Sequence, residues 1–289
     1  MHFGKHGIEI NAAGKALASV QRTLDEKEFL MLADDEGAQQ IRSYYRALSR
    51  AWGPQHWWPA QSPFEVIVGA YLTQNTTWTN VERALAKLRA ARLLSVSGIR
   101  RTRLRELERL IRSAGYFRQK AKRLKLFVEF LDERYGGSLA RMFAQPTEQL
   151  RHELLNLHGV GPETADSILL YAGNRAVFVV DAYTRRVLVR HEILPEKSDY
   201  EEIRRLFEGA LEPEQAVEES GKSGHQLRVE GPAGTAHPPS AMSEAKRTAL
   251  AQVYNEMHGL IVGVGKNYCR KSQARCDECP LQEFLPGAK

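Results

Sequence analysis

A glycine-rich turn is the first feature of this sequence whose residues suggest chemistry. It reads Leu-His-Gly-Val-Gly and places Gly159 and Gly161 between two stretches of helical periodicity. Two glycines permit a tight turn with positive φ and exposed backbone N–H groups. Pro162 suits the first position of the next helix, whose free N–H groups favour an anion such as a phosphate. A plain turn between packed helices has the same pattern, so the motif alone does not separate phosphate binding from simple helix packing.

An isolated acid follows this turn. Asp181 comes directly after the apolar run AVFVV and before AYTRRVLVR. A carboxylate at that position is a suitable helix N-cap. It could also stabilise positive charge on a sugar or activate water, as carboxylates do in sugar hydrolysis. The two roles are compatible, and the neighbouring residues do not separate them.

All three cysteines, Cys269, Cys276 and Cys279, lie near the C-terminus. An odd, clustered set favours metal chemistry over a disulfide framework. The N-terminal segment lacks the apolar stretch of a signal peptide, and no run approaches the ~18 apolar residues of a membrane helix. We therefore expect a cytoplasmic protein without membrane contact.

Positive charge is concentrated in one segment. Residues 98–125 contain eleven Lys and Arg against two acids, a net charge of +9, whereas the whole chain carries +6. Such a concentration is typical of a face that follows a phosphate backbone, although part of it must be an ordinary solvated helix surface.

The elements that must position these residues are helices. Apolar residues recur at helical spacing in residues 41–52, 64–72, 81–88 and 104–114. The run AVFVV is too short and isolated to indicate a sheet, so the sequence predicts an all-α fold. Residues 1–36 lack apolar periodicity and are expected to form a loosely packed extension. The proline- and glycine-rich residues 213–242 are expected to form a disordered insertion.

Together these features resemble the helix-hairpin-helix (HhH-GPD) DNA glycosylases of the endonuclease III superfamily. The resemblance covers about Trp52 to Cys279 apart from the insertion, and includes the segments FEVIVGAYLTQNTTWTNVERALAKL and GYFRQKA. Two segments, WWPAQSPFE and LTQNTTW, are most similar to the 3-methyladenine glycosylase branch. The family's fold implies two helical lobes with DNA in the cleft between them. Residues 64–189 would form the lobe with the hairpin, and residues 37–63, 190–212 and 243–289 the other.

The resemblance also implies roles for single residues. Asp181 matches the catalytic aspartate of the family. Endonuclease III has a lysine at the position of Glu163, and that amine forms a Schiff base that leads to strand cleavage. A glutamate cannot do this. We therefore expect a monofunctional DNA glycosylase of base-excision repair, a monomer that hydrolyses the N-glycosidic bond of damaged bases in double-stranded DNA.

Three tryptophans suggest which base is removed. Trp57, Trp58 and Trp78 could form a stacking pocket with Glu163 for a flipped base, although core packing is the alternative for each. Electron-rich indoles favour a cation, so an alkylated purine is the expected substrate. Gln74 and Asn75 would fill the gap that the base leaves, with polar capping as the alternative. The full set of residues expected to contact DNA is Gln74, Asn75, Gly159, Val160, Gly161 and Lys120.

The cysteine spacing C-x6-C-x2-C is similar to the iron–sulfur loop of the family, but Leu285 stands where the fourth cysteine would be. A [4Fe-4S] cluster with another fourth ligand, a [3Fe-4S] cluster and a decayed loop all stay open, and we narrowly favour a cluster. Zinc with His258 is a weaker alternative. Two rival functions also stay open: a bifunctional glycosylase/lyase that uses another amine, and a non-catalytic DNA-binding protein.

Overall fold

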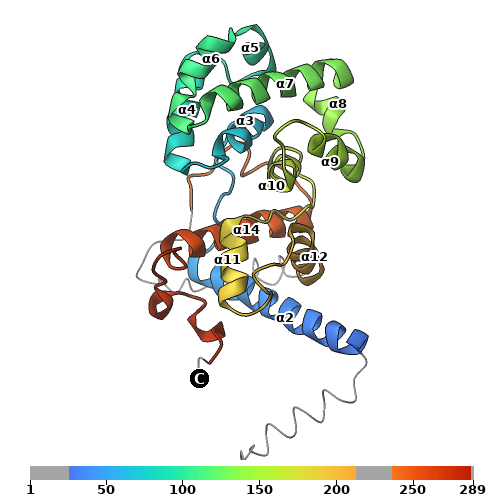
Figure 1. Cartoon of the computed structure of the whole chain (residues 1–289), viewed down its shortest axis with the longest axis vertical. Helices are drawn as coiled ribbons and strands as arrows, with labels where there is room; N and C mark the ends of the chain where they lie inside the picture. Colours follow the sequence, from blue (N-terminus) through green and yellow to red (C-terminus); the bar gives the residue numbers. More distant parts are fainter. Residues whose placement is uncertain (1–25, 213–235, 288–289) are drawn as a thin grey trace, which may run out of the picture.

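The computed structural model describes residues 26–212 and 236–287, apart from the side chains of residues 26–35. Its helices form two groups, one above the other in Figure 1, which we call the upper and lower lobes. No β-strand occurs in these residues, and 176–180, the AVFVV run, is an extended segment with four of its five side chains buried. The all-α prediction is confirmed.

The upper lobe is built around α3 (Pro63–Thr73), which is apolar on all sides and buried over nine consecutive residues from Phe64 to Leu72. Ser62 caps the helix by accepting a hydrogen bond from the N–H of Glu65, which stabilises it by about 1 kcal/mol. The lobe also contains α4 (Trp78–Ala90), α5 (Val96–Arg101), α6 (Leu104–Leu110), η1 (Arg112–Ala114), α7 (Phe117–Tyr135), α8 (Leu139–Phe143), α9 (Thr147–Leu155), α10 (Pro162–Ser167) and the π-helical turn η2 (Ile168–Ala172).

The lower lobe combines segments from both ends of the chain. Figure 1 shows α14 next to α11, with α12 to the right of α11 and α2 below them. Its elements are α2 (Glu26–Trp52), α11 (Ala182–Arg190), α12 (Tyr200–Ala210), α14 (Ala249–Asn267), η3 (Cys276–Glu278) and η4 (Gln282–Phe284).

Three predicted boundaries need correction. α11 was assigned to the hairpin lobe, yet Val187 and Leu188 are buried where it packs on α14, so the division falls near Asp181. α2 begins at Glu26, inside the predicted loose extension 1–36. The predicted insertion includes residues 236–242, which contact the fold at three points: the His237 N–H donates to the Gln55 carbonyl, and Ser240 and Met242 are buried. The rest of the predicted insertion, 213–235, and residues 1–25 lie outside the described residues.

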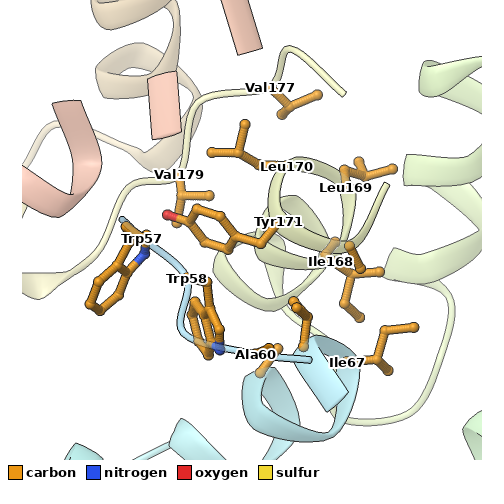
Figure 2. Packing of buried hydrophobic residues seen from close by; sticks show 14 of the residues in the cluster. Trp57, Trp58, Ala60, Ile67, Ile168, Leu169, Leu170, Tyr171, Val177 and Val179 are labelled. Atoms are coloured by element: carbon orange, nitrogen blue, oxygen red, sulfur yellow. The ribbon is translucent and has the colours of Figure 1, made fainter. Parts of the chain in front are cut away.

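The two lobes share one apolar core. Figure 2 shows Trp57 and Trp58, on the connection between α2 and α3, lying against Tyr171 of η2. The Trp58 ring lies against Gly69, where a Cβ atom would be only 3.1 Å from the indole, so this contact depends on the glycine. The described part of the chain contains no helix with the length and apolar character that crossing a bilayer requires.

Candidate active site in the cleft between the lobes

A cleft of about 860 Å³ opens where the lobes meet. Segments that are distant in sequence form its walls: the Trp57–Trp58 connection, the loop between α3 and α4, the glycine hairpin, residues 179–183 and α14, together with Arg123 and Tyr200. The residues with chemistry to offer are Trp57, Trp58, Gln74, Asn75, Trp78, Arg123, Glu163, Asp181, Tyr183, Tyr200, His258 and Lys266.

Asp181 is the N-cap of α11, and its two carboxylate oxygens have different surroundings. Oδ1 accepts hydrogen bonds from the Thr184 N–H at 2.8 Å and from the Thr184 hydroxyl at 3.0 Å. Oδ2 has neither contact and lies 3.6 Å from Nε2 of His258. The cap therefore fixes the side chain through Oδ1 and leaves Oδ2 as the oxygen available for chemistry.

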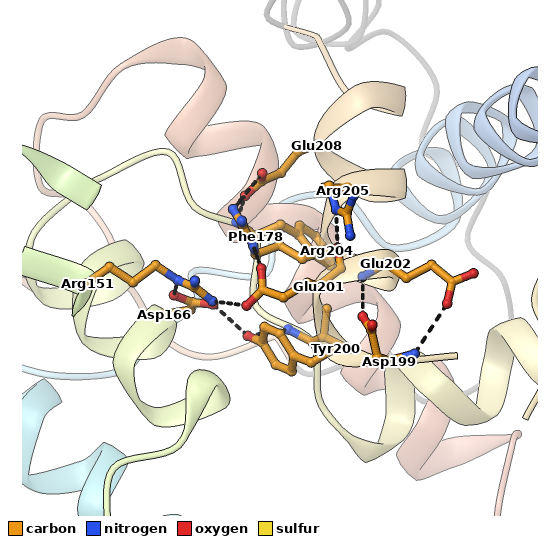
Figure 3. Close-up of polar contacts among 11 residues, drawn as sticks. Arg151, Asp166, Phe178, Asp199, Tyr200, Glu201, Glu202, Arg204, Arg205 and Glu208 are labelled. Atoms are coloured by element: carbon orange, nitrogen blue, oxygen red, sulfur yellow. Dashed lines mark hydrogen bonds and ion pairs between the residues drawn. The ribbon is translucent and has the colours of Figure 1, made fainter. Parts of the chain in front are cut away.

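A buried polar network fixes the backbone that leads into Asp181 (Figure 3). Arg151 of α9 binds Asp166 of α10 through two hydrogen bonds of 2.7 and 3.0 Å, and reaches Glu201 of α12 at 2.6 Å. The Tyr200 hydroxyl donates to Asp166 at 2.9 Å and accepts from the Val180 N–H at 3.2 Å. Since bidentate arginine–carboxylate pairs are geometrically specific, this network links the hairpin to the residue preceding Asp181.

Glu163 of α10 faces the same cleft. Burial by the cleft walls and, second, the negative charge of Asp181 raise the pKa of Glu163 to about 7. The residue is nevertheless exposed at the mouth of the cleft, so solvent moderates this effect. Glu163 thus holds its proton to a higher pH than an ordinary glutamate does, as acid groups in many active sites do.

This raised pKa predicts a pH-dependent effect of the substitution Glu163→Gln. An unfolded glutamate titrates near 4.5, so the folded protein holds the proton more tightly between pH 4.5 and about 7. Glu163 therefore makes stability fall as pH rises through that window. We expect the melting temperature of the variant, relative to wild type, to increase from pH 5 to pH 8.

Thermal unfolding at a series of pH values measures this difference. Glu148→Gln, at an exposed position of α9, controls for the general effect of removing one negative charge. A difference that stays constant or shrinks with rising pH would contradict the perturbed titration of Glu163.

The three predicted pocket tryptophans lie together. Ring centroids of Trp58 and Trp78 are 5.1 Å apart in an edge-to-face contact, and those of Trp57 and Trp78 are 6.2 Å apart. Trp57 and Trp58 are 5% exposed and contribute to the core as well as to the cleft, whereas Trp78 is only partly buried. Trp57 and Trp58 therefore pack in the core and also line the cleft, and their role as a base pocket stays a prediction.

Two of the cleft residues that sequence reasoning missed come from α14. Lys266 is half-buried, its Nζ lies 5.7 Å from the Trp57 ring centroid, and burial lowers its pKa while the charge of Asp181 opposes that change. His258 was considered only as a zinc partner for the cysteines, but it lies beside Asp181 in the cleft. A basic residue and a histidine within the apolar stretch MHGLIVGVGKN are the signal that could have found them.

The hairpin depends on one of its two glycines. Gly159 has a φ of +81°, and a Cβ atom there would lie 2.0 Å from Nε of Arg123. Gly161 is the extended N-cap of α10, with nothing within 4 Å of a Cβ position. Of these two glycines, Gly159 alone uses the positive φ that the sequence pattern permits. Val160 between them is buried.

The Gln74 side chain is bound to this hairpin. Its amide donates to the Gly159 carbonyl at 3.0 Å and to the Thr164 hydroxyl at 2.9 Å, and its carbonyl accepts from Arg123 at 2.7 Å. Asn75, the next residue, has a φ of +53° and makes the turn into α4. Gln74 therefore joins the α3–α4 loop to the hairpin, and Asn75 is the freer of the two predicted gap-filling residues.

Lys120 does not lie on the DNA-facing surface, and this prediction is corrected. It is 1% exposed, and its ammonium donates to the carbonyls of Leu72 and Ala114 at 2.9 and 2.8 Å. Burial and the charge of Arg123 lower its pKa to about 8. Lys120 instead ties the end of α3 to the turn at Tyr116, an aromatic residue that is 66% exposed with a φ of +43°.

The three cysteines line one small cavity with Leu285, Arg190 and His191. Burial raises the pKa of Cys279 to about 11, and the neighbouring Cys269 and Cys276 add to that rise. Within residues 26–212 and 236–287, no three His, Cys, Asp or Glu side chains are arranged to hold a metal ion. An iron–sulfur cluster at the three cysteines stays a prediction from sequence.

Comparison with known proteins shows the family of this chain. A model of the HhH-GPD superfamily base excision DNA repair proteins matches residues 68–213. MJ1434 of Methanocaldococcus jannaschii, assigned as a DNA repair glycosylase, is 40% identical over 85% of this chain and 96% of its own length. The chain belongs to the HhH-GPD superfamily. It is a DNA repair glycosylase of that superfamily, and the resemblance found in the sequence is confirmed.

Other HhH-GPD proteins support the same placement. Endonuclease III of Bacillus subtilis is 25% identical over 76% of this chain and 79% of its own. Among solved structures, the 3-methyladenine DNA glycosylase MagIII of H. pylori, bound to 1,N6-ethenoadenine, has a TM-score of 0.59 at 27% identity and covers 80% of this chain and 97% of its own. A trapped covalent endonuclease III–DNA intermediate has a TM-score of 0.64 at 20% identity, over 87% and 96% of the two chains, and shows the shared fold.

Proposed function

We propose that this HhH-GPD protein is a monofunctional glycosylase that removes alkylated purines from double-stranded DNA. The observation that carries the proposal is the content of the cleft: Asp181 with a free Oδ2, three tryptophans, and Glu163 at the position where endonuclease III has its lysine. The likeness to an H. pylori enzyme whose name specifies 3-methyladenine supports the same substrate class.

The chemistry needs a cation-binding pocket and one carboxylate. An alkylated purine carries positive charge, and the faces of indole rings attract cations. Such a base is already a good leaving group, so it needs little help from an acid. Positive charge then develops on the sugar, where Oδ2 of Asp181 can stabilise it or take a proton from the attacking water.

DNA would lie across the upper lobe and the hairpin. The α3–α4 loop, the hairpin and the turn at Tyr116 are connected by the hydrogen bonds of Gln74 and Lys120, so they form one rigid rim beside the cleft. The exposed Tyr116, flanked by Arg112 and Arg118, suits insertion into a base stack while the arginines neutralise phosphates.

The direct test is base release from DNA treated with a methylating agent. We expect the purified protein to release methylated purines, detected by mass spectrometry, and to leave the resulting abasic strand unbroken. Strand integrity is read on a denaturing gel with and without alkali, which breaks abasic sites chemically. Absence of base release, with duplex binding intact, would favour the non-catalytic DNA-binding protein.

Lys266 is the residue through which the bifunctional alternative would act. It carries the only side-chain amine among the described residues that line the cleft. A Schiff base with DNA can be trapped with borohydride. We expect no such adduct with wild type. A stoichiometric adduct that disappears in Lys266→Met would establish a glycosylase/lyase and overturn the monofunctional assignment.

A further inference from the structure

A buried tyrosine–histidine pair lies directly behind Asp181. The Tyr171 hydroxyl is 2.5 Å from Nδ1 of His258, and both side chains are enclosed by the core. The other ring nitrogen, Nε2, has no hydrogen-bond partner within the described residues and lies 3.6 Å from Oδ2 of Asp181. An unpartnered buried nitrogen that faces the reactive oxygen calls for an explanation.

The surroundings decide which nitrogen holds the proton. Burial lowers the pKa of His258, so the ring is neutral and has one N–H. Burial also raises the pKa of Tyr171 well above its usual value, so its O–H is retained. If Nδ1 carried the proton, the Nε2 lone pair would face the Asp181 carboxylate. If the Tyr171 O–H donates to Nδ1, the proton resides on Nε2 and faces Oδ2, which is the favourable arrangement.

Neighbouring groups agree with this direction. The Trp57 ring lies against Tyr171, but an indole has only a donor to offer and this N–H makes no hydrogen bond, so Trp57 cannot accept the Tyr171 proton. Tyr171 is therefore left to donate its own proton to His258. The charged groups that act on the His258 ring are Asp181 and Lys266.

We propose that His258 is a positioning residue for Asp181, with its Nε2–H directed at Oδ2 and its tautomer set by Tyr171. Thr184 fixes Oδ1 and His258 restrains Oδ2, so the carboxylate is held at both oxygens against the developing charge on the sugar. We expect the distance of 3.6 Å between Nε2 and Oδ2 to shorten when a substrate fills the cleft, because catalytic hydrogen bonds commonly tighten in the substrate complex. This inference rests on the proposed catalytic role of Asp181.

Activity measurements test the role in the reaction. Loss of the restraint in His258→Ala should lower the single-turnover rate of base release by about 10- to 100-fold, with affinity for lesion DNA changed by less than about 3-fold. His258→Gln, which can present an N–H near the same point, should restore most of the rate. Tyr171→Phe should cause a smaller loss, because the tautomer is no longer fixed.

A second buried pair of the same kind supplies the matched control. Tyr44 and His191 make the same contact, hydroxyl to Nδ1, at 2.7 Å, away from the cleft. His191→Gln and Tyr44→Phe therefore report the structural cost of disrupting such a pair. Equal rate losses in the two sets of variants, or no rescue by His258→Gln, would overturn the positioning role.

A spectroscopic test does not depend on activity. In protein labelled with ¹⁵N-histidine, the ring nitrogens of His258, assigned by comparison with His258→Gln, should show the Nε2–H tautomer, and Asp181→Asn should shift them. A proton on Nδ1 would overturn the proposal even if the enzyme is active. If the protein releases no alkylated purine but the tautomer is as expected, the proposed function fails while the His258–Asp181 contact stands.

Discussion

Asp181→Asn is expected to lower the single-turnover rate of base release by on the order of 10²–10⁴-fold, the usual loss for a positioned proton-transfer group. Asparagine is also a good N-cap, so its carbonyl can still accept from the Thr184 N–H and α11 should remain intact. What the variant loses is the negative charge of Oδ2, which the sugar requires only as the bond breaks. Affinity for lesion DNA should therefore change little, since that charge acts mainly in the transition state.

Asp199→Asn provides a matched control for this loss. Asp199 is the N-cap of α12, accepts from the Glu202 N–H at 2.7 Å, and is absent from the cleft lining. Asp199→Asn removes one charge from one helix cap, as Asp181→Asn does, and should leave the rate of base release unchanged. Near-normal turnover of a folded Asp181→Asn protein would remove Asp181 from the mechanism.

Local patterns predicted the elements well because their causes are local. The apolar run FEVIVGAYL gives a helix because Ser62 and Pro63 start it and its residues are buried on every side. The hairpin and the N-cap at Asp181 follow in the same way from Gly159, Pro162 and a carboxylate three residues before Thr184. These features require only residues that are close in the sequence.

The remaining part of the site depends on contacts between distant segments. α14 brings His258 and Lys266 to Asp181 across more than seventy positions of sequence, and no local pattern encodes that approach. Lys120 was instead assigned to the DNA-contacting surface although it is buried. In a segment rich in Lys and Arg it looks like one more surface charge, yet carbonyls from two other segments bind it in the core. Net charge predicts a basic face but cannot say which of its residues are on it.

Gly159→Ala is expected to weaken binding to any duplex, damaged or not, by about tenfold or more. An alanine at a φ of +81° costs about 1–2 kcal/mol, and its Cβ would in addition meet Arg123 at 2.0 Å. Relief of that contact moves either the hairpin or Arg123, and Arg123 is the donor that holds Gln74. Because backbone contacts to phosphate set the register of the whole complex and carry no base information, affinities for lesion and undamaged DNA should fall together.

Gly161→Ala separates this effect from a general sensitivity of the hairpin. Gly161 lies only two residues after Gly159, but its backbone is extended and no atom lies within 4 Å of its Cβ position. Its free protein should therefore melt as wild type does, whereas Gly159→Ala should melt at a lower temperature. Kd values for undamaged and lesion duplexes, measured by fluorescence anisotropy at one fixed salt concentration, provide the comparison. If Gly159→Ala lost affinity for lesion DNA alone, the hairpin would belong to base recognition in the cleft, and the phosphate contacts would have to come from other elements of the upper lobe.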